Sequence, residues 1–253
     1  MKRSNSITMI TAAFAVLCTG GVLLATQVSD RIESSAKKSY VFKTYLKSDH
    51  IKIHATSDST VILTGTVSVW PHSSLAEETV AGLPGVVRVD NKLKVKNGHP
   101  AENSDAWISI KVKTMLLFHR SVSGFKTDVD VKNGVVVLHG HAKSEAQKEL
   151  TTGYVRDVDG VQSVKNDMTV RNSKKTTLEK IGGNIDDASI TAQVKVALLF
   201  HRSTSVMKTK VDTKNGVVTV RGVADNNAEK DLVSKLVIDI KGVKNLNNEM
   251  TIK

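Results

Sequence analysis

The sequence predicts an α+β protein built from three tandem α-β-β-α-β modules, each with two helices on a three-stranded mixed sheet. Two observations lead to this prediction. Segments of the chain recur at constant spacing, and each recurring unit passes from helical to strand periodicity and back. Of the 253 residues, 40% are hydrophobic but only 4% are aromatic, so small cores of Val, Ile, Leu and Ala are expected.

The N-terminal segment, residues 1–28, has the layout of a secretory signal peptide. Lys2 and Arg3 precede an uncharged run from Ile7 to Val28, and Ala25 is an acceptable cleavage position. The run is also long enough to remain as an uncleaved membrane anchor. Either outcome places the modules outside the cytoplasm and predicts a periplasmic protein.

Cys18, inside this run, is the only cysteine of the chain. Lipid attachment at Cys18 is an alternative, although Leu17 precedes it where lipoprotein signals carry a small residue. Without the signal, the mature protein has no disulfide, thiol redox chemistry or cysteine nucleophile. The formal net charge of +11 calls for an anionic partner, and export excludes nucleic acid from that role.

Two long segments define the repeat. Residues 105–121, which end in Leu-Leu-Phe-His-Arg-Ser, recur at 187–203, and the Lys-Asn-Gly-Val-Val segment at 132 recurs at 214. Glycine spacing reveals a third, diverged copy. In three pairs the glycine follows the aspartate by 35 residues: Asp30 and Gly65, Asp105 and Gly140, and Asp187 and Gly222. A second glycine follows 20 residues later and an asparagine six after that: Gly85 and Asn91, Gly160 and Asn166, and Gly242 and Asn248.

These landmarks divide the chain into module 1 (29–96), module 2 (105–171) and module 3 (187–253), joined by linkers at 97–104 and 172–186. In module 2, apolar residues at helical spacing predict a first helix with Asp105 as its N-cap. Strands over 126–131 and 135–139 flank an Asn-Gly pair, the strongest short signal for a tight hairpin turn.

A second helix from Ser144 to Asp157 follows in module 2, with Ala146, Leu150 and Tyr154 on one face. Residues 163–170 form the last strand. The residues expected to serve turns or close backbone approach are Gly65, Asn133, Gly134, Gly140, Gly160, Asn215, Gly216, Gly222 and Gly242.

Module 1 departs from its siblings. Asp58-Ser59 stands in place of Asn-Gly, Pro71 lies near the start of the second helix, and Lys43-Thr44-Tyr45 replaces Phe-His-Arg. We expect the fold to be retained there, but not a surface function shared with the other two modules.

The motifs resemble those of the BON domain. The resemblance rests on an opening Asp-Ala-x-Ile, a hairpin Asn-Gly-Val-Val-x-Leu-x-Gly, and a closing Gly-Val-x-x-Val-x-Asn-x-Met-Thr-Val. It covers 105–171 and 187–253 strongly, and 30–96 more weakly but in register. It implies the α-β-β-α-β fold, a periplasmic or envelope location, a role in osmotic or envelope stress, and binding to phospholipid rather than catalysis.

The sequence offers little for catalysis. His139 and His141 lie two apart on a strand, and their counterparts in the other modules are not ligands, so exposed histidines are the better interpretation. His119 and His201 repeat, but neither has a Cys, Asp or Glu at ligand spacing. No motif for a nucleophile, a phosphate loop or a zinc helix occurs. We therefore expect no enzyme, metal or cofactor.

The first helix supplies the predicted functional surface. A tryptophan beside lysines suits a membrane interface, where rings lie at headgroup level and cations meet anionic lipid. In lipid-binding BON modules this helix is the implicated surface. The residues expected to contact lipid are Trp107, Lys111, Lys113, Phe118, Arg120, Lys195, Phe200 and Arg202. The competing interpretation places the phenylalanines in the core, Trp107 against a neighbouring module and the lysines on a solvated face.

Each basic residue contributes about 1 kcal/mol at an anionic surface, so a single module is expected to bind a membrane weakly. Linking the modules raises the overall affinity for the membrane through effective concentration. The predicted function is therefore multivalent binding to anionic phospholipid membrane surfaces. The alternatives are a chaperone or adaptor for envelope proteins, and a module that binds a solute or a polymer such as peptidoglycan. The sequence leaves the oligomeric state open.

Overall fold

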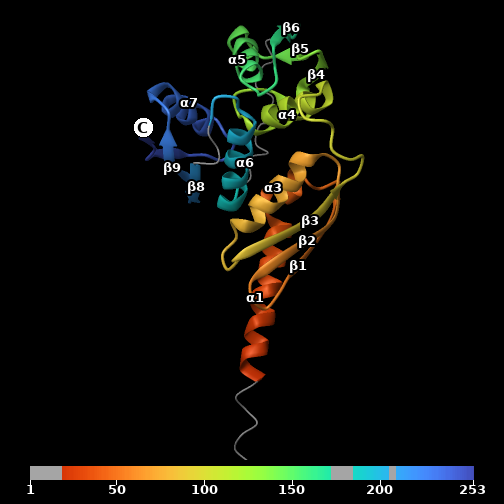
Figure 1. Ribbon diagram of the computed structural model, residues 1–253, viewed down its shortest axis with the longest axis vertical. Coiled ribbons are helices and arrows are strands. Elements are labelled where there is room, and N and C mark those ends of the chain that lie inside the picture. Colours follow the sequence, from red (N-terminus) through yellow and green to blue (C-terminus); the bar gives the residue numbers. More distant parts are fainter. Residues whose placement is uncertain (1–18, 172–184, 205–208) are drawn as a thin grey trace, which may run out of the picture.

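The computed structural model describes residues 19–171, 185–204 and 209–253. The first 18 residues of the predicted signal segment and residues 172–184 of the predicted second linker lie outside this description. Within the described ranges, no helix is both long and apolar enough to cross a membrane. The three modules form one elongated body, with module 1 at the lower end and modules 2 and 3 side by side above it (Figure 1).

The predicted α+β fold with three α-β-β-α-β modules is confirmed. Module 1 contains α1 (Thr19–Lys38), α2 (Tyr40–Thr44), β1 (His50–Ala55), β2 (Thr60–Val67), α3 (Trp70–Ala81) and β3 (Arg88–Val95). Module 2 contains α4 (Asp105–Phe118), the 3₁₀ turn η1 (Gly124–Lys126), β4 (Thr127–Lys132), β5 (Val135–Ala142), α5 (Glu145–Arg156), β6 (Ser163–Asn166) and β7 (Thr169–Val170). Module 3 contains α6 (Asp187–Phe200), β8 (Thr209–Lys214), β9 (Val217–Ala224), α7 (Asn227–Ile238), β10 (Asn245–Asn248) and β11 (Thr251–Ile252).

Each sheet has the same mixed topology. The second strand of the module is central, antiparallel to the first strand and parallel to the last. The parallel pairing requires the crossover that α3, α5 and α7 provide. Val and Leu on the inward side of the central strands are fully buried, as the aliphatic composition predicted.

The repeated aspartate at the start of α4 has a different role from the predicted one. Ser104, one residue earlier, is the N-cap, and its hydroxyl accepts from the backbone N–H of Trp107. The Asp105 carboxylate instead accepts from the N–H groups of Asn133 (2.8 Å) and Gly134 (2.9 Å). Asp187 binds the turn of module 3 in the same way. The aspartate thus holds the hairpin turn against the first helix, because its carboxylate satisfies two donors that the turn leaves free.

The landmark glycines take equivalent places in all three central strands. Gly65, Gly140 and Gly222 have φ of +113°, +116° and +150°. A Cβ on Gly140 would lie 2.1 Å from the carbonyl oxygen of Lys126, and one on Gly65 would lie 1.9 Å from that of His50. Any other residue would therefore push the first strand away.

The landmark asparagines join the last strand to the second helix. In module 2, the Asn166 side-chain amide donates to the carbonyl of Lys148 (2.9 Å) and the hydroxyl of Thr152 (2.8 Å). Its oxygen accepts from the N–H of Met168 (3.0 Å). Asn248 repeats this pattern with Lys230, Ser234 and Met250, and Asn91 of module 1 has the corresponding role. The conserved spacing thus reflects a structural bond rather than a surface site.

Module 1 differs at both ends of its first strand. α1 runs without interruption through Asp30, so this aspartate lies inside a helix and not at its start. The helix ends only at Lys38, and the hydroxyl of Ser39 caps the short α2. The hairpin loop spans 56–59, longer than the expected two-residue turn, and Ser59 adopts φ +63° in it.

The second helix of module 2 is rotated relative to the predicted face. Ala146 and Leu150 are exposed, whereas Thr151 and Val155 are buried. Tyr154 is half-buried because it faces module 3. α5 thus covers its own sheet with small residues.

Candidate functional site

Most of the residues predicted to contact lipid lie between the modules. Phe118 and Phe200 are each only 1% exposed and Lys111 only 3%, so these three side chains are buried rather than on the surface predicted to contact lipid. Lys113, Arg120 and Arg202 remain exposed. The surface expected to meet a membrane is used mainly to pack three modules together.

Modules 2 and 3 bind each other through a reciprocal pair of contacts, here called the clasp. The N–H of Arg120 donates to the carbonyl of Asp239 (2.9 Å), and the N–H of Lys241 donates to that of Phe118 (3.0 Å). The mirror contacts use equivalent residues: Arg202 to Asp157 (3.0 Å) and Asp159 to Phe200 (2.9 Å). The repeated Phe-His-Arg segment of each module therefore forms a short antiparallel bridge with the loop after the second helix of the other.

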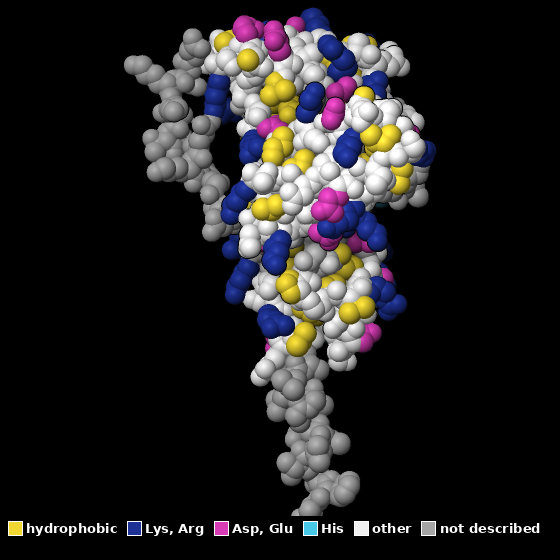
Figure 2. Space-filling model, turned by 90° about the vertical axis from the view of Figure 1, so that its left-hand side faces the viewer, with side chains coloured by type: hydrophobic (Ala, Val, Ile, Leu, Met, Phe, Trp, Pro, Cys, Tyr) yellow, Lys and Arg dark blue, Asp and Glu magenta, His cyan; other side chains and the backbone are white. Residues whose placement is uncertain are grey.

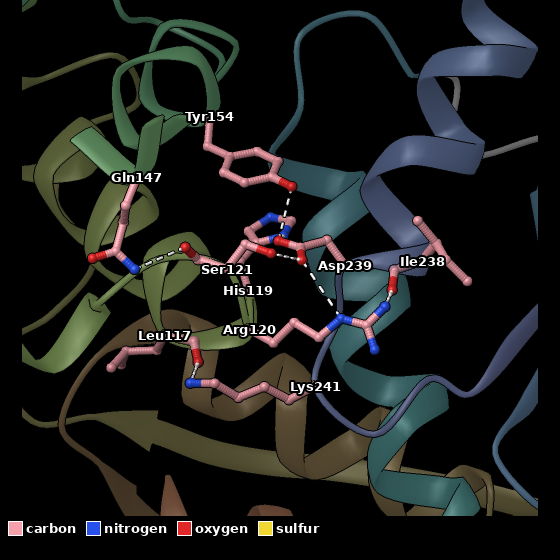
Figure 3. A network of polar contacts seen from close by, with 9 residues as sticks. All are labelled: Leu117, His119, Arg120, Ser121, Gln147, Tyr154, Ile238, Asp239 and Lys241. Atoms are coloured by element: carbon pink, nitrogen blue, oxygen red, sulfur yellow. Dashed lines mark hydrogen bonds and ion pairs between the residues drawn. The ribbon is translucent and has the colours of Figure 1, made fainter. Parts of the chain in front are cut away.

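Arginine side chains reinforce both halves of the clasp. Arg120 donates to the carbonyls of Val243 (3.1 Å) and Ile238, and its contact with Ile238 is visible in Figure 3. Arg202 donates to those of Arg156 (2.5 Å) and Val161 (2.5 Å). Ile238 and Arg156 are the last residues of α7 and α5, and helix C-termini favour cations because their carbonyls lack partners.

A buried polar network fills the centre of one half of the clasp (Figure 3). His119 is fully buried, stacks on the ring of Tyr154 (centroids 3.9 Å apart), and places Nδ1 3.2 Å from Oδ2 of Asp239. The hydroxyls of Tyr154 (2.8 Å) and Ser121 also donate to the Asp239 carboxylate. Although burial by itself raises the pKa of Asp239, the nearby His119 and the hydrogen bonds from Ser121 and Tyr154 bring it below its usual value. Burial and the hydrogen bond to Asp239 raise the pKa of Tyr154.

The other half of the clasp is looser. His201 is 3% exposed, and its Nε2 lies 3.7 Å from Oδ2 of Asp157. Burial lowers the pKa of His201, and the nearby Asp157 carboxylate opposes that shift only in part. The two halves of the clasp thus use equivalent residues, but these residues are packed less tightly in the second half.

Aromatic rings join module 1 to the other two. The only two tryptophans of the chain, Trp70 of α3 and Trp107 of α4, stack with centroids 4.3 Å apart and an interplanar angle of 12°. Phe200 of module 3 meets Trp70 edge-on at 5.0 Å, and Tyr45 meets Phe118 at 5.4 Å. The scarce aromatic residues are therefore concentrated where modules meet, and Trp107 packs on a neighbouring module.

The remaining predicted lysines have acidic partners. Lys111 contacts Asp159 (2.9 Å) and lies 5.8 Å from the Trp107 ring centre. Lys195 of module 3 pairs with Glu78 of module 1 (2.7 Å), and both side chains are about one-third exposed. This pair crosses the contact between α6 and α3, the most extensive contact between two of the described helices.

Sequence reasoning missed the acidic half of the clasp, although a signal was present. Asp157 and Asp239 occupy equivalent positions, and module 1 has Gly82 there. Module 1 also lacks the histidine and the arginine, so the three residues are lost together. Their joint loss from one copy is typical of residues that act on one another.

His139 and His141 are exposed on β5, and the latter contacts the hydroxyl of Thr169 (2.6 Å). Across the described ranges, no group of three or more His, Cys, Asp or Glu side chains is placed to hold a metal ion.

Comparison with known proteins follows the same three-module division. The BON domain profile matches residues 28–97, 104–172 and 186–253. The chain is 32% identical over 151 residues to osmotically-inducible protein Y of Escherichia coli (strain K12), covering 59% of this chain and 73% of that protein. It is 27% identical over 149 residues to an uncharacterized protein of Anaplasma centrale, covering 59% and 95%. CdsD, a structural protein of the type III secretion system of Chlamydia trachomatis, aligns over 88% of this chain and 90% of its own with 16% identity and a TM-score of 0.23.

The fold and the repeated interface define a tandem-repeat α+β protein whose modules pack through their first helices. Since the family profile covers nearly all of the described residues, the chain belongs to the BON-domain family. It is related to an osmotically inducible protein.

Proposed function

We propose that this chain is a non-catalytic protein of the bacterial periplasm that associates with anionic phospholipid surfaces during osmotic or envelope stress. The observation that carries the proposal is the combination of an excess of positive charge with mostly buried apolar residues on the first helices. The net charge is +11, and most described apolar residues of α4 and α6 are buried, in their own module or against another, whereas Leu199 is 49% exposed. The binding expected from such a surface is peripheral and electrostatic, without an inserted apolar anchor from the modules.

Figure 2 supports this interpretation for one face of the molecule. Lysine and arginine side chains occur along the length of this face, and hydrophobic side chains lie between them in small separate groups. On this face, such small separate groups do not form the continuous apolar patch that marks a surface for binding other proteins. The signal-like N-terminal segment and the osmotic relative both support a periplasmic site of action.

Vesicle co-sedimentation tests the proposal. We expect the full-length protein to sediment with phosphatidylglycerol vesicles at low salt, to be released at high salt, and not to sediment with phosphatidylcholine vesicles. The release is expected because salt screens contacts between exposed charges. Absence of binding to phosphatidylglycerol at low salt would contradict the proposal, and so would salt-insensitive binding to unfolded proteins.

A further inference from the structure

The sheet of module 1 turns one face to solvent. α1 and α3 contact β1 and β3, and Ile53 and Leu63 are buried on that inner side. Side chains alternate along a strand, so the outward positions follow from the strand register. The outward polar residues that matter here are Lys52, Thr64, Thr66, Arg88, Lys92 and Lys94. The sheet lies on the side of module 1 away from α6 (Figure 1).

The register arranges these residues in rows across the sheet. Lys52 on β1 is paired with Thr64 on β2, which is paired with Lys92 on β3. In the next row, Thr66 lies beside Lys94. Because neighbouring strands are about 4.8 Å apart, the lysines of one row flank a threonine hydroxyl within a span of about 10 Å. Ammonium and hydroxyl groups so arranged can donate together to phosphate oxygens.

Little acidic charge opposes these cations. Lys92 pairs with Asp90 (2.8 Å) at the surface. Within the described part of the chain, Lys52, Arg88 and Lys94 have no ion pair. The nearest acid to the exposed His54 at the edge is Glu33 of α1, 3.7 Å away.

The equivalent faces of the other modules carry more acidic side chains. The row that reads Lys52–Thr64–Lys92 in module 1 reads Asp128–His139–Asp167 in module 2 and Lys210–Arg221–Glu249 in module 3. In module 3, Arg221 is held by both Asp212 (3.2 Å) and Glu249 (2.7 Å). In module 2, Lys165 pairs with Asp167 (2.7 Å). One fold thus presents three different faces, and only that of module 1 combines several cations with one acid.

We infer that the outward sheet face of module 1 is the surface that docks on an anionic phospholipid bilayer, an inference that rests on the proposed function. Charge complementarity selects the occupant, because headgroup phosphates provide many acceptors in one plane. A three-stranded sheet likewise presents its outward side chains close to one plane. The helices and the clasp then hold modules 2 and 3 above the docked face.

The test compares two double variants of the full-length protein with the same change of charge. Lys52→Gln/Lys94→Gln removes two cations from the module 1 face, and Lys210→Gln/Lys214→Gln removes two from the face of module 3. Binding is measured by titration with vesicles of phosphatidylglycerol and phosphatidylethanolamine at low salt. Each lysine at the docked face is expected to contribute about 5-fold to partitioning, so the module 1 variant should bind about 25-fold more weakly. The module 3 variant should lose at most a few-fold.

Controls separate docking from folding and from charge alone. All four positions are exposed, so the far-ultraviolet circular dichroism and the urea midpoint should not change. Lys52→Arg/Lys94→Arg should keep wild-type binding. Equal losses in the two Gln variants, or a larger loss for module 3, would overturn the docking face while leaving the proposed function intact. Equal competition by a soluble polyphosphate and by vesicles would also overturn it, by showing that a planar surface is not required. Failure of the wild type to bind would overturn both.

Discussion

Modules 2 and 3 contact each other through equivalent residues, whereas module 1 contacts both through residues that its siblings lack. The clasp uses a histidine, an arginine and an aspartate from each of modules 2 and 3. Module 1 has Thr44, Tyr45 and Gly82 at those positions. Tyr45 instead donates to the carbonyl of Leu117 (3.2 Å) and meets Phe118, and a Cβ on Gly82 would lie 3.2 Å from Ala188.

This difference shows how a repeat can acquire separate roles. The fold-forming bonds, such as those of Asn91, Asn166 and Asn248, are kept in every module. The contact residues diverged, and module 1 joined the pair through aromatic packing and close helix approach. Its outward sheet face also carries fewer acids than the equivalent faces of the other two modules. A diverged repeat can therefore keep the fold while its contact residues and its surface charge change.

The largest expected effect concerns the core of the clasp. Phe118→Ala should lower the free energy of unfolding by about 3–5 kcal/mol, because a fully buried ring between modules would leave a cavity. Urea unfolding measures this loss. Lys43→Ala, the equivalent change in module 1, and Phe125→Ala at a ring that is 72% exposed, should each have little effect. A similar loss in all three variants would contradict the assignment of Phe118 to the interface.

The two halves of the clasp should respond unequally to loss of their aspartates. Asp239→Ala leaves the Tyr154 and Ser121 hydroxyls without their acceptor, and should cost about 2–3 kcal/mol. Asp157 is 46% exposed and lies farther from its histidine, so Asp157→Ala should cost well under half as much. Thermal and urea unfolding of the two variants measure the difference. Equal costs would contradict a larger contribution to stability from the network around Asp239.

The turn contact of modules 2 and 3 provides a matched test against module 1. Asp105→Ala removes two charge-assisted hydrogen bonds to the hairpin turn and should lower stability by about 1–2 kcal/mol. Asp30→Ala at the equivalent position inside α1 should have almost no effect on unfolding by urea. A destabilisation by Asp30→Ala as large as that of Asp105→Ala would mean that the three aspartates share one role.

The smallest expected effect is a pH dependence from His201. Its pKa is lowered by burial, so the unfolded chain binds more protons than the folded one just below about pH 6.5, and the unfolding free energy declines as the pH falls through that range. The charged groups that face it are Asp157 and Arg202, with His119 nearby. Asp239, whose pKa is below its usual value, loses its stabilising charge only in stronger acid. His201→Gln should flatten the decline in urea midpoint between pH values above and below about 6.5, and an unchanged slope would exclude His201 as its source.

The module fold was predictable because its signals are local or repeated. Turn residues such as Asn133 and Gly134, the helical spacing in 105–118 and the constant glycine offsets all report on structure within one module. Details at the boundaries were less predictable. Ser104 rather than Asp105 caps α4, because the carboxylate of the aspartate is engaged by a turn 28 residues away.

The sequence could not decide whether the first helix of module 2 contacts lipid or another module. Trp107 and Phe118 read equally well as membrane contacts or as packing residues, because an amphipathic helix presents the same pattern to either apolar partner. In the structure, other parts of the same chain cover these residues: Trp107 stacks on Trp70, and Phe118 meets Tyr45. The basic face of module 1 was not predicted, because its lysines are far apart in the sequence. They come together only when the strands pair in the observed register.

The sequence by itself determined a triplicated α-β-β-α-β fold, its turns and its excess positive charge. Each of these depends on residues close together in one module or on composition. The tertiary structure decided which apolar faces are buried between modules, which histidines face aspartates, and where the cations gather. These are contacts between residues far apart in the chain, and their energies depend on distances that spacing in sequence does not fix.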